Sequence, residues 1–146
     1  MIEQRNISVI SNKTVKMDGH RILEEIIERD YCMAWLLVGL SNSHIKNKLA
    51  FKGGTALRRC YFANYRFSED LDFTLIEALS LDDLLKAFGA IFELVKDEVG
   101  LTFNIGKIEP SSKNTHTFYI EYNGPLPPKN ILSSIKEVAL RKELGI

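Results

Sequence analysis

Residues 51–75 read FKGGTALRRCYFANYRFSEDLDFTL and contain two unusual features close together. A short apolar segment ends at the pair Gly53 and Gly54, after which apolar residues recur at helical spacing. Further on, Asp70 and Asp72 stand one residue apart at the start of a second apolar segment. The stretch therefore predicts a strand, a glycine turn, a helix and a second strand that carries a pair of acids.

The composition is that of an ordinary globular protein. The chain has 146 residues, 45% apolar and 26% charged, which favours one domain with a substantial core over residues 1–146. Lys+Arg and Asp+Glu are equal at 19 each, so no overall basic surplus points to nucleic acid, although a local basic patch can still exist. Residues 1–17 show weak periodicity and are expected to form an extended or partly ordered arm.

The sequence carries no pattern of secretion or membrane insertion. The N-terminus lacks the features of a signal peptide, and Cys32 and Cys60, which have no metal-ligand spacing, are interpreted as reduced thiols in the core. The longest apolar run, about Tyr31–Leu40, is far shorter than the roughly 20 residues that span a bilayer. We therefore expect a cytoplasmic protein without a membrane-spanning segment.

Helices and strands are predicted in alternation along the chain. Hydrophobic periodicity predicts helices over about 18–28, 30–40, 55–61 and 80–99. Short apolar or alternating runs predict strands over about 49–51, 67–75, 101–109, 115–122 and 132–141. This order favours an α+β domain, with α/β as the alternative, in which helices flank a mixed sheet.

A glycine pair between a strand and a helix can bind an anion. A phosphate can approach the backbone of Gly53 and Gly54 closely, and the first N–H groups of a helix have no partner within it. Thr55 adds a hydroxyl at the helix start that can donate to a phosphate oxygen, and Lys52 adds positive charge. The GxxxxGK[ST] spacing of a P-loop is absent, and a simple tight turn is the alternative explanation.

Asp70 and Asp72 favour a metal site. Side chains alternate along a strand, so both aspartates project to one side and Leu71 to the other. Two carboxylates so close together repel each other, and a bound divalent cation removes that repulsion. Magnesium takes carboxylate oxygens together with substrate phosphates, and two ions can share such a pair during phosphoryl transfer. The alternative is an exposed acidic strand face or turn.

The residues just before the aspartates supply a turn and a charge. Ser68 and Glu69 are interpreted as the cap or turn at the start of the strand. Arg66 is expected to pair with Glu69 or with a substrate phosphate. We expect the rest of the chain mainly to hold the glycine turn and the acid pair in register.

Together, these residues resemble the pattern of polymerase-β-type nucleotidyltransferases, which is an apolar strand, Gly-Gly-Thr/Ser, a helix and a strand carrying Asp-x-Asp. More narrowly, KGGTALRR at 52–59 followed by RFSEDLDF at 66–73 resembles the AbiEii/AbiGii toxin family. That family provides the toxin of type IV toxin–antitoxin and phage-abortive systems. The close resemblance covers residues 51–75, and a looser one extends from about residue 20 to the end.

The resemblance implies a polymerase-β-like nucleotidyltransferase core and its reaction. It assigns Gly53, Gly54 and Thr55 to the nucleoside triphosphate, and Asp70 and Asp72 to Mg²⁺ or Mn²⁺ ions. The implied reaction is in-line attack of an acceptor hydroxyl on the α-phosphate of an NTP, with pyrophosphate leaving. The expected nucleotide-binding set also includes Lys52, Arg66 and Ser68.

The resemblance also implies partners. Some members of the family add nucleotides to tRNA acceptor ends and so block translation, which makes tRNA or another RNA the expected acceptor. The usual genetic partner of the family is a separate antitoxin protein with a DNA-binding domain. The sequence identifies neither the NTP nor the acceptor.

The third carboxylate of the family pattern is altered here. Family members usually carry it on a later strand, in a pattern like Ile-Lys-x-Asp, and Val138 stands where that aspartate falls. Glu137 is adjacent, which in a regular strand means the opposite face unless the strand slips or bulges by one residue. We expect Glu137 to be the third catalytic acid, with Glu121 as the other candidate, and either can instead be a solvated strand residue.

Length is the second departure. The family normally continues into a helical half, and this chain ends at Ile146, about where that half begins. We therefore expect a fragment, a truncated gene product or a minimal variant, without the substrate positioning that the helical half provides. Two alternatives to an active enzyme follow. One is a degenerate member that binds nucleotide or a protein partner without catalysis, and the other is an interaction module whose acidic strand is accidental.

Overall fold

The computed structural model describes residues 1–18, 22–61, 67–110, 112, 115–127 and 134–141, and for 15–18, 134–139 and 141 it describes the backbone alone. Helices and strands alternate along these residues. In chain order they are α1 (Gln4–Asp18), α2 (Glu24–Ser41), η1 (Lys46–Lys48), β1 (Leu49–Lys52), α3 (Gly53–Ala56), η2 (Leu57–Tyr61), β2 (Asp70–Leu75), α4 (Leu81–Val99), β3 (Thr102–Ile108), β4 (Thr115–Asn123) and β5 (Ser134–Arg141).

The five strands form a mixed sheet in the order β1-β2-β5-β4-β3. Strands β2 and β5 run parallel, and the other neighbouring pairs are antiparallel. The expected α+β fold with a mixed sheet is confirmed, and each strand predicted from the sequence is present. Strand β2 starts at Asp70, later than predicted, so the first acid of the pair is the first residue of its strand.

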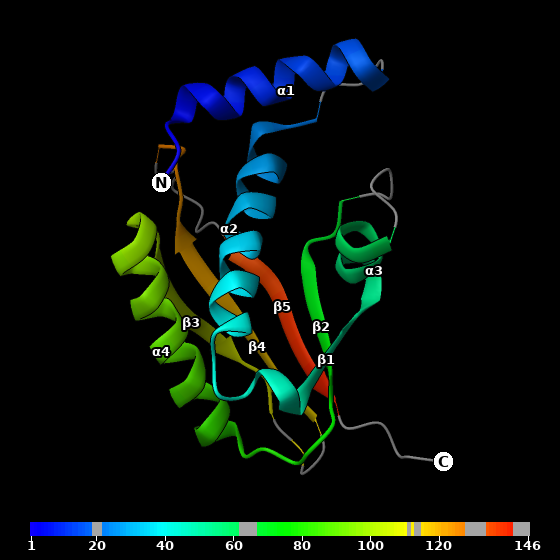
Figure 1. Cartoon of the computed structure of the whole chain (residues 1–146), viewed down its shortest axis with the longest axis vertical. Helices are drawn as coiled ribbons and strands as arrows, with labels where there is room; N and C mark the ends of the chain where they lie inside the picture. The colour runs from blue at the N-terminus through cyan, green and yellow to red at the C-terminus, as the bar shows by residue number, and fades with distance from the viewer. Residues whose placement is uncertain (19–21, 62–66, 111, 113–114, 128–133, 142–146) are drawn as a thin grey trace.

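Helices α2 and α4 lie side by side over one face of the sheet, and the core lies between them and the strands (Figure 1). Strict alternation along β2 and β4 decides which side chains enter this core. Phe73 and Phe118, one from each strand, are 2% and 0% exposed, and Phe118 packs edge-on against Phe88 of α4. Full burial of one such ring contributes on the order of 1.5–3 kcal/mol, so this face stabilises the sheet.

The opposite side of the sheet is half-exposed and mostly polar. It is formed by the residues of β2 and β4 that alternate with the buried ones. We call it the polar face, and we define it by Asp70, Asp72, Thr117, Tyr119 and Glu121.

Helix α4 begins and ends where the sequence predicts. The Ser80 hydroxyl accepts a hydrogen bond of 3.1 Å from the backbone N–H of Asp83, which satisfies one of the unpaired donors of the first turn. Gly100 ends the helix with a left-handed backbone, at φ 75°, and donates to the carbonyl of Lys96.

The expectation of an extended arm over residues 1–17 is wrong, because Gln4–Asp18 is a helix. Its buried side is narrow: Ile7 and Ser11 are both 0% exposed, and the Ser11 hydroxyl donates to the carbonyl of Ile22 at 2.5 Å. So few buried apolar residues produce almost no hydrophobic periodicity in the sequence. They are nevertheless enough for the helix to pack against the rest of the chain.

Two further expectations need correction. The helices predicted before and after residue 30 form the continuous helix α2, because its buried positions carry on from Ile27 to Cys32 and Leu36. Cys32 is buried as expected, but Cys60 is exposed. Among the described residues, no helix combines the length and the hydropathy needed to cross a bilayer.

Candidate functional site

The glycine turn and the acid pair are in direct contact. Strand β1 ends at Lys52, which lies opposite Asp72 in the antiparallel β1–β2 pair. Gly53 then takes a left-handed backbone, at φ 82°, and a Cβ atom built on it would lie 2.5 Å from Oδ2 of Asp72. The conformation and the close approach both require glycine at this position. The glycine turn and the acid pair, which are separate in the sequence, therefore lie together in the structure.

Both aspartates belong to the polar face. Asp70 and Asp72 are half-exposed, while Leu71 and Phe73 between and after them are buried in the core. The predicted alternation is thus present. The accidental-acid alternative required the aspartates to lie far from the glycine turn, and the contact between Gly53 and Asp72 argues against it.

The Thr55 hydroxyl makes a hydrogen bond within the protein in the described structure. Its side chain is 2% exposed, and its hydroxyl donates a hydrogen bond of 2.6 Å to the backbone carbonyl of Asp70. A hydroxyl has one hydrogen to donate, so this bond takes the donor that was expected for a phosphate. Thr55 ties the helix after the glycine turn to the first residue of β2.

The strand register bears directly on the third carboxylate. Parallel pairing of β2 and β5 sets Glu137 beside Asp70, and Val138 beside the buried Leu71. Neighbouring positions in register belong to the same face of a sheet, so position 137 shares the face of Asp70 in the β2–β5 pair. The concern that Glu137 falls on the opposite face does not apply, although its side chain lies outside the described part.

Glu121 is on the polar face but at a distance from the aspartates. Its register partner on β5 is Ser134, three positions along that strand from Glu137. From strand spacing and rise, its Cα lies roughly 14 Å from that of Asp70. The Glu121 carboxylate points toward β3, away from β5 and β2, because a Cβ atom built on Gly106 of β3 would lie 2.9 Å from Glu121 Oε1. The register therefore favours Glu137 over Glu121.

The arginines that follow the glycines are engaged in structural contacts. The Arg59 guanidinium pairs with the Asp30 carboxylate at 2.9 Å and donates to the Asp30 carbonyl at 2.6 Å. The Arg58 guanidinium lies 3.6 Å from the centre of the Phe67 ring. These contacts fasten η2 to α2 and to the segment before β2, and no local pattern in the sequence predicts Asp30 as a partner of Arg59.

Of the other residues expected to contact the nucleotide, Ser68 and Lys52 are described by the structure and Arg66 is not. Ser68 accepts a hydrogen bond of 3.4 Å from the N–H of Asp70, as expected of a turn at the start of the strand. Glu69 pairs with Arg29 of α2 at 2.8 Å. Arg66 lies outside the described residues. Lys52 is next to the acids through its register with Asp72.

The donor set suits a hard divalent cation. Asp70 and Asp72 offer carboxylate oxygens on one half-exposed face, and magnesium prefers oxygen ligands shared with substrate phosphates. Where side chains are described, no group of three or more His, Cys, Asp or Glu comes together.

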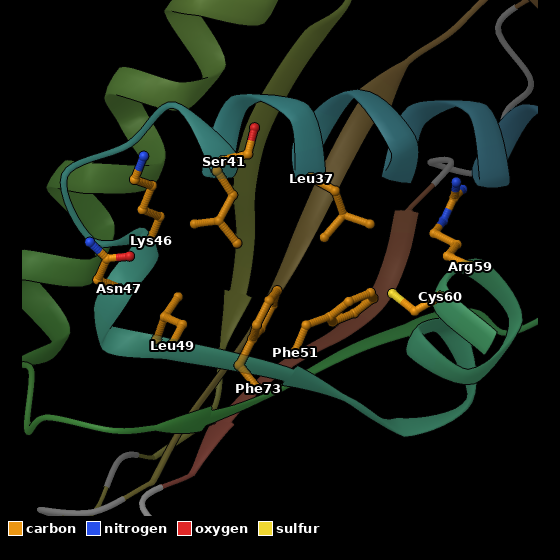
Figure 2. Close-up of a pocket in the computed structure, with 10 residues that line it drawn as sticks. Leu37, Ser41, Lys46, Asn47, Leu49, Phe51, Arg59, Cys60 and Phe73 are labelled. Carbon is orange, nitrogen blue, oxygen red and sulfur yellow. The ribbon is translucent and has the colours of Figure 1, made fainter.

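A cavity of about 440 Å³ lies on the other side of the sheet, between α2, β1 and η2 (Figure 2). Its walls are largely apolar, because Leu37 of α2 faces Phe51 and Phe73 of the sheet across it. Phe51 and Phe73 project toward the core, away from the polar face. This cavity offers little to a triphosphate, and the acids do not line it.

A buried thiol offers no alternative nucleophile. Burial raises the pKa of Cys32 well above its usual range, and the nearby Glu28 carboxylate raises that pKa further. The thiol is therefore protonated at neutral pH, and Cys32 is 0% exposed.

Comparisons with known proteins are consistent with this geometry. A family model described as nucleotidyl transferase AbiEii toxin, type IV TA system, matches residues 35–136. The chain is similar in structure to a protein from H. pylori described as a nucleotidyltransferase, with a TM-score of 0.56 and 18% identity over 84% of this chain and 48% of that one. It is similar as well to JHP933 from Helicobacter pylori, with a TM-score of 0.57 and 19% identity over 86% of this chain and 47% of that one.

At such low identity the two structures establish the fold alone. The chain spans about half the length of each of them. No curated protein matches the chain in sequence.

Proposed function

The chain belongs to the AbiEii nucleotidyl transferase toxin family, and we propose that it carries the catalytic site of a nucleotidyltransferase that moves NMP from an NTP to an acceptor. The observation that carries this proposal is the contact between Gly53 and Asp72. It joins a backbone that phosphates can approach to a carboxylate that can hold their metal. Neither half would suffice alone, because phosphoryl transfer depends on positioning and on charge together.

In this proposal the three acids have different roles. Asp70 and Asp72 bind divalent cations, Mg²⁺ or Mn²⁺, from the polar face. When bound, such ions neutralise phosphate charge and orient the in-line displacement. Glu137, in register with Asp70, takes the proton from the acceptor hydroxyl. The new bond joins the acceptor oxygen to the α-phosphorus, the α–β phosphoanhydride bond breaks, and pyrophosphate leaves.

The glycine turn holds the triphosphate. Gly53 and Gly54 let the phosphates reach the backbone, and the Lys52 ammonium adds positive charge beside Asp72. Arg66 and Ser68 are further contacts in this proposal. Thr55 contributes through its backbone and through the hydrogen bond that holds Asp70 in place.

The biological setting is also proposed. We take the whole protein to be the toxin of a type IV toxin–antitoxin or abortive-infection system that acts in the cytoplasm. Its acceptor is tRNA or another RNA, and a cognate antitoxin is its protein partner. These statements rest on the family, since the chain spans about half of the structures it resembles.

A transfer assay tests the proposal. The protein is incubated with Mg²⁺, each α-labelled NTP in turn and total RNA, and compared with Asp70→Asn and Asp72→Asn. Asp97→Asn, on the exposed side of α4, is the matched control. Label should appear on an RNA with wild type and with the control, and should fall by orders of magnitude in the two site variants.

Absence of label with every NTP would favour the degenerate member instead. Binding of Mg²⁺ and nucleotide by calorimetry then distinguishes a protein that keeps the site from one that has lost it.

A further inference from the structure

Two irregularities in the sheet meet at Tyr119. On one side, β3 pairs with β4 at Ile105↔Ile120 and next at Ile108↔Phe118, so residues 106–107 both lie opposite Tyr119. On the other side, β5 pairs with β4 at Phe118↔Val138 and next at Ile120↔Ile135, so residues 136–137 lie opposite the same tyrosine. Bulges recur beside functional sites, where they re-aim a side chain.

The Tyr119 ring belongs to the polar face. Its neighbours Phe118 and Ile120 are both 0% exposed and enter the core, so Tyr119 projects the other way and is half-exposed. The Lys107 ammonium lies 5.9 Å from the centre of the tyrosine ring and pairs with Glu109 at 2.9 Å. An aromatic ring and a cation are therefore exposed together.

Tyr119 lies in the same row of the sheet as the first acid. Asp70 is in register with Glu137, and Tyr119 lies opposite the step that contains Glu137. Two strand spacings put the Cα atoms of Asp70 and Tyr119 about 10 Å apart. A nucleotide whose phosphate lies at the acids can extend its base along the polar face toward this ring.

Half-exposed aromatic residues on a strand are often only good strand formers. Two features of Tyr119 are not explained by strand formation alone. They are the bulges on both sides of it and the Lys107 cation beside its ring, and both lie in the same row of the sheet as Asp70 and Glu137. Aromatic rings with nearby cations bind nucleobases because every base has a face that can stack.

We propose that Tyr119 is a stacking platform for a nucleobase, with Lys107 drawing the attached phosphate to it. The proposal rests on the proposed function, which places phosphates at Asp70 and Asp72. The base belongs either to the NTP or to the end of the acceptor RNA, and the two arms of the test distinguish them.

The test measures binding and needs no turnover. One arm titrates a fluorescent ATP analogue with Mg²⁺, and the other titrates a short fluorescein-labelled single-stranded RNA. Tyr119→Phe keeps the stacking face, and Tyr119→Ile removes it while keeping a residue that strands favour. Tyr119→Phe should bind like wild type, and Tyr119→Ile should bind one probe about 5- to 150-fold more weakly, the range for loss of one base–aromatic stack.

Lys107→Gln provides a second variant that does not disturb the sheet, because Lys107 is exposed. Lys107→Gln should weaken the binding of the same probe and reduce the dependence of that binding on salt concentration. Lys96→Gln, on α4, is the matched control and should change neither. Unchanged binding of both probes by Tyr119→Ile, or no binding of either probe by wild type, overturns the platform.

The experiments distinguish failure of the stacking platform from failure of the proposed nucleotide transfer. If wild type transfers nucleotide and Tyr119→Ile binds both probes normally, the platform is wrong and the activity stands. If no transfer occurs but Tyr119→Ile loses affinity for a probe that Tyr119→Phe retains, the platform stands and the activity is wrong.

Discussion

The hydroxyl of Thr55 donates a hydrogen bond of 2.6 Å to the backbone carbonyl of Asp70, which is 15 residues further along the chain. The bond is partly buried, since Thr55 is 2% exposed and Asp70 is half-exposed, and it connects the segment after the glycine turn to the strand that carries both acids. It makes the position of Asp70 depend on a residue that need not touch substrate.

Replacing Thr55 with valine tests this dependence. Valine has the shape of threonine without the donor, so the free energy of unfolding should fall by about 1–3 kcal/mol, as for a lost buried hydrogen bond. Transfer should fall mainly in kcat, because Asp70 is displaced. Thermal unfolding and steady-state kinetics measure the two effects. Thr55→Ser keeps the donor and should restore kcat. A rise in KM for the NTP with unchanged stability would instead mean that the hydroxyl binds phosphate.

Gly53→Ala should damage both stability and activity. A non-glycine residue at φ 82° costs on the order of 1–2 kcal/mol, and the new Cβ would press on the Asp72 carboxylate. Gly89→Ala is the matched control, since a Cβ there meets nothing within 4 Å and lies in helix α4. Alanine at 89 should stabilise the fold by about 0.5–1 kcal/mol. Chemical denaturation compares the two, and equal effects would contradict the close packing at Gly53.

The two candidate third acids should respond differently to neutralisation. Glu137→Gln should lower kcat roughly 10²- to 10⁴-fold, the scale for losing a general base. Glu121→Gln should leave kcat nearly unchanged, because the register sets Glu121 away from Asp70. Single-turnover transfer rates measure both. A larger loss with Glu121→Gln would reverse the assignment.

The two cysteines should differ sharply in reactivity. Cys60 is exposed and should react with a thiol reagent at once, whereas Cys32 should react only after unfolding. The pKa of Cys32 is raised in the folded state, so above about pH 8.5 the unfolded chain loses a proton that the folded chain keeps. Stability should therefore fall as pH rises through that range, and Cys32→Ala should reduce this slope. Mass spectrometry after brief alkylation, and unfolding at pH 7 and 9.5, provide the readouts.

Local pattern was enough to predict most of the elements. Alternation placed Asp70 and Asp72 on one face, and hydrophobic periodicity over 80–99 predicted α4. These features depend on neighbours within one turn or one strand, so the sequence contains their causes. The helix α1 was missed because its buried side rests on Ile7 and Ser11, too few apolar residues for a periodic signal.

The order of strand, glycine turn, helix and strand, and the presence of the acid pair, follow from the sequence alone. The contact of Asp72 with Gly53, the position of Glu137 rather than Val138 beside Asp70, and the hydrogen bond of Thr55 to a carbonyl depend on the tertiary structure. The register between strands far apart in the chain depends on how their buried faces pack together. A shift of one residue would move every side chain of a strand to the other face, and the pattern of one strand does not identify which residue of another strand lies beside it.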